Sequence, residues 1–110
     1  MADTYNKCDV CESEVSEELL YAARLAVRAN RTSAYDKEIK DLILAARAEL
    51  TEVGVLPAKA YDDTDPLAKR ACILYVKAEF GLDNPDAARY RESFDSLKKH
   101  LSLSSEYIGG

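Results

Sequence analysis

The chain has 110 residues, of which 47% are hydrophobic and 32% are charged, as is typical of one soluble globular domain. The formal net charge is −5, and residues 1–18 supply all of it, because six carboxylates there stand against one lysine. The other residues hold fourteen acids and fourteen bases, which argues against a basic platform that grips nucleic acid.

Residues 1–15 are polar and acidic, and we expect them to be poorly ordered. They lack the basic and apolar regions of a secretory signal, and no apolar run in the chain approaches the ~20 residues of a membrane span. Cys8 and Cys11 form a C-x-x-C pair, but a structural zinc needs about four ligands and no partner pair follows. We interpret both thiols as incidental, with a metal half-site completed by another subunit as the alternative, and expect no metal and no cofactor. Cys72 lies in an apolar stretch and is expected to be a small buried hydrophobe.

Apolar residues at helical spacing predict a first helix from about Ser16, which can cap it. Arg24, Arg28 and Arg31 lie at i, i+4 and i+7 along its edge. They form a candidate basic ridge for an acidic partner or for DNA phosphate, and a solvated helix edge is the plainer interpretation. A second helix is predicted from about residue 33 to residue 53, with Gly54 at its end.

A third helix is predicted from Pro66 to about Phe80, with Asp65 as its N-cap and Gly81 at its end. It is apolar around most of its circumference, so it should be central or should place one face against another subunit. Its candidate interface residues are Ile73, Val76 and Phe80. The preceding connector holds Asp62, Asp63 and Asp65, whose spacing does not match a calcium loop.

A fourth helix is predicted from Asn84, its cap, to about Leu101, forming a tight hairpin with the third. Residues 102–110 are expected to be an extended tail that becomes ordered on a partner. The tail carries three further candidate interface residues, Leu103, Tyr107 and Ile108. The sequence therefore predicts an all-α fold: a poorly ordered segment (1–15), one bundle of about four helices (16–101) and an extended tail (102–110).

No catalytic constellation is visible. His100 is the only histidine, and it is expected near a helix C-terminus, where a cation complements the helix dipole. The chain contains no phosphate-binding glycine loop and no nucleophile elbow. We therefore predict a protein that is not an enzyme.

Three strings carry a family resemblance: ILYVKAEFG at residues 73–81, DNPDA at 83–87 and LKKHLSLSSEY at 97–107. They resemble the small helical head-tail connector proteins, or adaptors, of long-tailed phages and of prophages in Gram-positive bacteria. Such proteins are often labelled DNA-packaging or head-completion proteins. The resemblance is strongest over residues 65–107 and weaker over 19–54. The acidic N-terminus and the final Ile-Gly-Gly depart from the pattern.

The resemblance implies a structural protein of the virion that forms a homo-oligomeric ring under the portal protein. The ring would extend the DNA channel and offer a platform to the neck or tail-completion protein, while double-stranded DNA passes without sequence-specific binding. It would be made in the cytoplasm of the bacterial host and act at the head-tail interface. The alternatives are a generic helical protein-protein interaction domain and a helix-turn-helix DNA-binding regulator.

Overall fold

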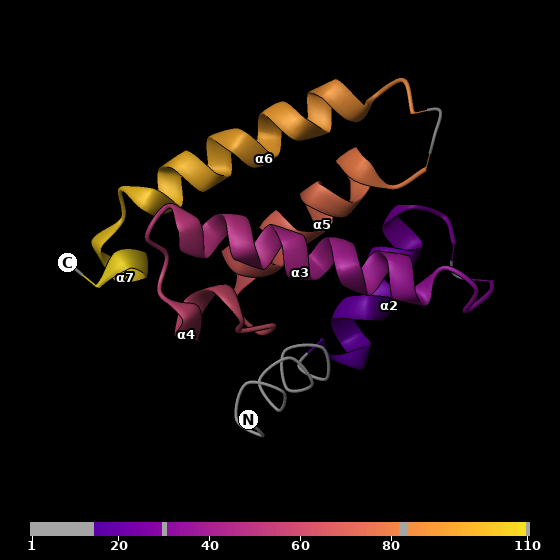
Figure 1. Ribbon diagram of the computed structural model, residues 1–110, viewed down its shortest axis with the longest axis horizontal. Helices are drawn as coiled ribbons and strands as arrows, with labels where there is room; N and C mark the ends of the chain where they lie inside the picture. The colour runs from indigo at the N-terminus through magenta and orange to yellow at the C-terminus, as the bar shows by residue number, and fades with distance from the viewer. Residues whose placement is uncertain (1–14, 30, 82–83, 110) are drawn as a thin grey trace, which may run out of the picture.

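The computed structural model describes residues 15–29, 31–81 and 84–109 (Figure 1). Within these ranges the chain is helical and contains no strand, which confirms the predicted all-α class. The expectations for residues 1–14, including Cys8 and Cys11, lie outside this part. The helices are α2 (Glu17–Ala26), α3 (Asp36–Glu52), α4 (Pro57–Ala60), α5 (Pro66–Glu79), α6 (Ala87–Ser102) and α7 (Ser105–Ile108).

Local capping chemistry sets where two of the long helices begin, as predicted. The Ser16 hydroxyl accepts the N–H of Leu19 at 3.0 Å at the start of α2. The Asp65 carboxylate accepts the N–H of Ala68 at 2.9 Å at the start of α5, where Pro66 is the first helical residue. Each cap satisfies a backbone donor that the helix itself cannot pair.

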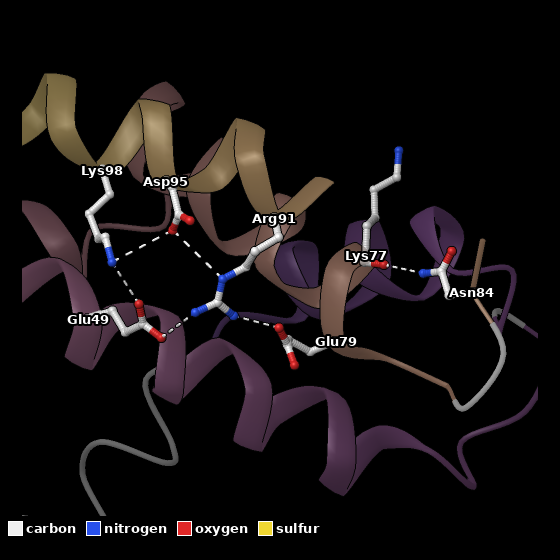
Figure 2. Close-up of polar contacts among 7 residues, drawn as sticks. All are labelled: Glu49, Lys77, Glu79, Asn84, Arg91, Asp95 and Lys98. Atoms are coloured by element: carbon white, nitrogen blue, oxygen red, sulfur yellow. Dashed lines mark hydrogen bonds and ion pairs between the residues drawn. The ribbon is translucent and has the colours of Figure 1, made fainter. Parts of the chain in front are cut away.

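Asn84 acts differently from the predicted cap, because α6 begins only at Ala87. Its side-chain oxygen accepts the N–H of Asp86 at 3.0 Å, which closes a local turn around Pro85. Its amide nitrogen donates to the carbonyl of Lys77 at 2.7 Å (Figure 2). Asn84 therefore ties the last turn of α5 to the start of α6 and fixes the hairpin between them.

Helix α5 is the central element. It contacts α2, α3 and α6, while α3 crosses in front of it and α6 runs along the upper edge (Figure 1). Its Val76 has no exposed surface and its Cys72 is 2% exposed. The burial of Cys72 confirms the prediction, but Val76 is a core residue rather than an interface residue. The reason is that α3 and α6 together cover most of the apolar surface of α5.

A buried ion pair joins three parts of the chain. Arg47 of α3 is completely buried and pairs with Asp63 in the connector before α5. The other oxygen of Asp63 accepts the N–H of Ser16 at 2.8 Å, and the Arg47 guanidinium lies 4.9 Å from the Tyr61 ring centre. The pair therefore fixes the start of α2 against α3 and the connector.

The extended tail is not observed. Residues 105–108 form α7, and Tyr107 is buried against the bundle. The Tyr107 hydroxyl donates to the Asp65 carboxylate at 2.9 and 3.0 Å, and its carbonyl accepts the N–H of Leu56 at 2.8 Å. The tail folds back because burial of the apolar Tyr107 ring is favourable once its hydroxyl and its backbone carbonyl both have hydrogen-bond partners.

Candidate interaction surfaces

The candidate basic ridge does not continue along one helix, because α2 ends at Ala26. Arg28 adopts a left-handed conformation (φ 61°) just after the helix. The Arg28 N–H donates to the Leu25 carbonyl at 3.1 Å, and the Ala29 N–H donates to the Arg24 carbonyl at 2.8 Å. This is the Schellman ending, at whose left-handed position glycine is the usual residue.

The three arginines therefore have different surroundings. Arg24 is held by Asp36 of α3 through two hydrogen bonds of 2.8 and 2.5 Å, and this contact lowers the pKa of Asp36. Arg28 and Arg31 are exposed and line one hollow of the surface. Only these two remain available to a partner.

Arg28 and Arg31 line a hollow of about 590 Å³ together with Tyr35 and Phe80. A second hollow of about 390 Å³ adjoins it and shares Val27, Arg28 and Phe80. The rings of Tyr35 and Phe80 meet edge to face at 5.5 Å, and Tyr35 is 48% exposed. We call these five residues, Val27, Arg28, Arg31, Tyr35 and Phe80, the end groove. The groove brings one predicted interface residue, Phe80, beside two residues of the predicted ridge.

The other end of the molecule carries α7 (Figure 1). Leu103, in the turn between α6 and α7, is 75% exposed, more than any other large hydrophobic side chain in the described ranges. Glu106 is 71% exposed and lies 3.9 Å from Lys59. We call Leu103 and Glu106 the C-terminal corner. Ile108 is half-buried near Gly54, and Tyr107 holds the corner in place rather than facing outward.

A network of five charged residues holds α6 against α3 and α5 (Figure 2). Arg91 of α6 reaches Glu79 of α5 at 2.5 Å and Glu49 of α3 at 3.6 Å. Lys98 donates to Glu49 at 2.9 Å, and Asp95 lies 3.7 Å from Arg91 and 3.8 Å from Lys98. Burial alone would raise the pKa of Glu49, but Lys98 and Arg91 outweigh it and the pKa is lowered. The sequence analysis missed this network, since its members come from three helices.

The carboxylates of the connector before α5 all have structural partners. Within the described residues, no group of three or more histidine, cysteine or carboxylate side chains could hold a metal ion. Asp62 accepts a hydrogen bond from the Thr64 hydroxyl, Asp63 forms an ion pair with Arg47, and Asp65 caps α5. Each of these carboxylates therefore has a structural partner. None of the described helices is both long enough and apolar enough to cross a membrane.

Residues 20–108 match the family described as phage connector protein. The chain belongs to this family. The match covers every described helix from the first turn of α2 to the last residue of α7 and confirms the resemblance drawn from three shorter strings. No curated protein and no solved structure matches the chain significantly. Membership makes this protein a structural phage connector and implies a place at the head-tail junction.

Proposed function

We propose that this phage connector protein assembles as a ring beneath the portal protein, continues the DNA channel and receives the neck or tail-completion protein. The family match over residues 20–108 is the observation that carries the proposal. The role is structural, without catalysis or cofactor. Assembly takes place in the cytoplasm of the host, and the ring remains in the virion.

The two ends of the protomer supply the proposed ring contact. The end groove presents the exposed Tyr35 beside Phe80, and the hollow is lined by the cations Arg28 and Arg31 and by the carboxylates Glu38 and Glu79. The C-terminal corner presents the exposed Leu103 and the acidic Glu106. A contact between different surfaces at the two ends of a protomer is heterologous, and repetition closes it into a ring when the rotation permits. Leu103 of one protomer would enter the end groove of the next.

Ile73, Phe80, Leu103 and Ile108 thus stay the proposed interface residues. Ile73 and Ile108 are half-buried, so each keeps some exposed surface. Tyr107 acts indirectly, because its bonds to Asp65 and Leu56 set the position of the corner.

The proposal is tested by adding purified protein to phage heads that lack it and examining their necks by electron microscopy. Wild-type protein should add a ring under the portal and restore tail attachment. Leu103→Asp should fold normally, because the side chain is exposed, but should reduce ring addition at least tenfold. Tyr21→Asp is the matched control, since Tyr21 is 52% exposed and lies outside both surfaces.

Two results would count against the proposal. Heads that gain no ring from wild-type protein would refute the connector ring itself. Full activity of Leu103→Asp would refute the proposed end-to-end contact while leaving the ring intact.

A further inference from the structure

The outer edge of the α5–α6 hairpin is basic. Lys69, Arg70 and Lys77 lie along α5, and Arg89 lies beside them on α6. They line two adjoining hollows of about 250 and 400 Å³ that share Arg70 and Ile73. None of the residues that line either hollow is acidic. We call Lys69, Arg70, Lys77 and Arg89 the basic strip.

The cations of the strip are weakly neutralised. Within the part of the chain that the structure describes, neither Lys69 nor Arg70 has a carboxylate within 4.0 Å. Arg89 lies 3.6 Å from Asp86, and both side chains are more than half exposed. The Lys77 ammonium lies 4.4 Å from the Tyr90 ring centre, a contact that leaves its charge in place.

The opposite side of the same hairpin collects the acids. There Glu49, Glu79 and Asp95 all form ion pairs with Arg91, Lys98 or both (Figure 2). The balanced charge of residues 19–110 is therefore unevenly distributed: Glu49, Glu79 and Asp95 are paired with Arg91 and Lys98, whereas among the described residues Asp86 is the one carboxylate within 4.0 Å of a cation of the strip, which keeps a local excess of positive charge.

We propose that the basic strip faces the DNA in the assembled ring and contacts phosphates of the duplex backbone. This inference rests on the proposed ring. Lysine and arginine neutralise phosphates without reading sequence, which suits a channel that must pass any genome. From residue 69 to residue 77 the strip spans roughly 12 Å at 1.5 Å per residue, a length over which a duplex presents about seven phosphate charges.

The number of cations also sets the strength of the contact. Four per protomer neutralise only part of the phosphate charge that they face, so each contact stays weak and exchanges easily as DNA moves. A protein partner fits less well, because interface cores are enriched in aromatic side chains and depleted in lysine. The lining side chains around the strip that carry apolar surface are Pro66, Ile73, Leu74 and one aromatic residue, Tyr90, whose ring is already in contact with the Lys77 ammonium.

The test measures binding of a dye-labelled 20-base-pair duplex, by fluorescence anisotropy, to the whole chain and to its complex with the portal, from 50 to 200 mM salt. With four phosphate contacts per protomer, affinity should fall about 150-fold over this range. Lys69→Gln with Arg70→Gln should weaken binding at 50 mM salt and reduce that fall to about 12-fold, as two contacts require. Lys37→Gln with Lys99→Gln makes the same change in net charge elsewhere on the surface and should leave the salt dependence unchanged.

Two results would overturn the inference: no duplex binding by either the chain or the portal complex, or an equal loss of binding in the control variant Lys37→Gln with Lys99→Gln. A competition experiment adds polyglutamate, an acidic peptide that should occupy the strip. Duplex binding that stays equally tight in the presence of polyglutamate would also overturn the inference. Tighter binding of a polyglutamate peptide than of duplex would instead assign the strip to an acidic protein. Normal portal assembly by the strip variant with lost duplex binding supports the inference. Native mass spectrometry measures whether wild-type protein joins the portal, independently of duplex binding. Failure to join the portal counts against the proposed function.

Discussion

Arg47 is a single residue on which three segments depend. Its guanidinium is completely buried, and its partner Asp63 also holds the backbone of Ser16. Charged groups are stable in such a place only when they are paired, because desolvation otherwise disfavours them. The pair therefore links the start of α2 to α3 and to the connector before α5.

Arg47→Met should lower the free energy of unfolding by about 3–5 kcal/mol, because the carboxylate of Asp63 is left without its cation in a largely buried place. Adding Asp63→Asn should recover part of this loss, since asparagine is neutral and still accepts the Ser16 N–H. Urea denaturation of the single and double variants measures both effects. A double variant no more stable than Arg47→Met would show that packing, rather than charge, explains the loss.

Arg28 occupies a backbone position that favours glycine. Arg28→Gly should raise the free energy of unfolding by about 1 kcal/mol, because glycine adopts positive φ without strain. The same change should weaken ring addition, since the guanidinium of the end groove is lost. Arg28→Ala separates the two effects: it retains the strain but removes the guanidinium. Thermal unfolding gives the stabilities, and an Arg28→Gly chain no more stable than wild type would contradict the strain.

At the scale of elements, the sequence predicts best what local chemistry decides. The starts of α2 and α5 were predictable because Ser16 and Asp65 bond donors three residues ahead. The burial of Arg47 was not, because its partner lies sixteen residues away and no local pattern joins them. Helix α7 was also missed, since its stability comes from Asp65 and Leu56, more than forty residues earlier. The end groove was not predicted: Arg28, Arg31 and Phe80 were named in separate candidate sites, and their meeting with Val27 and Tyr35 depends on the fold.

The docking of α7 should depend on pH. Burial, together with the hydrogen bond to Asp65, raises the pKa of Tyr107 to about 12, whereas an unfolded tyrosine titrates near 10. Stabilisation by the neutral phenol is therefore complete below about pH 10 and is lost as the pH rises towards 12. Tyr107→Phe should cost about 1.5 kcal/mol at pH 7, the value of a hydrogen bond to a charged group.

The measurement compares unfolding of wild type and Tyr107→Phe from pH 7 to pH 11. The difference between the two free energies of unfolding cancels the titration of groups that both proteins share. This difference should be constant up to about pH 9 and should shrink above pH 10. A difference that does not change over the whole range would mean that the hydroxyl of Tyr107 is not held by Asp65.

At the scale of the whole molecule, the fold distributes charge unevenly over the surface. The composition shows only that residues 19–110 are neutral, whereas the structure places paired acids against α3 and a basic strip on the outer edge of the hairpin. Exposed large hydrophobic side chains include Tyr35 in the end groove and Leu103 in the C-terminal corner, and also Tyr21, Leu25, Val53 and Leu56 elsewhere. A protomer with two different interaction surfaces, the end groove and the C-terminal corner, and with one basic edge is suited to a ring around DNA.

Native mass spectrometry of the purified chain, alone and mixed with the portal protein of the same phage, tests the connector ring most directly. The account predicts a complex with a fixed number of copies per portal ring, whether or not the chain forms a ring alone, because protomer contacts below about 1,000 Å² are usually weak by themselves. A chain that stays monomeric and does not bind the portal at any ratio would contradict the account.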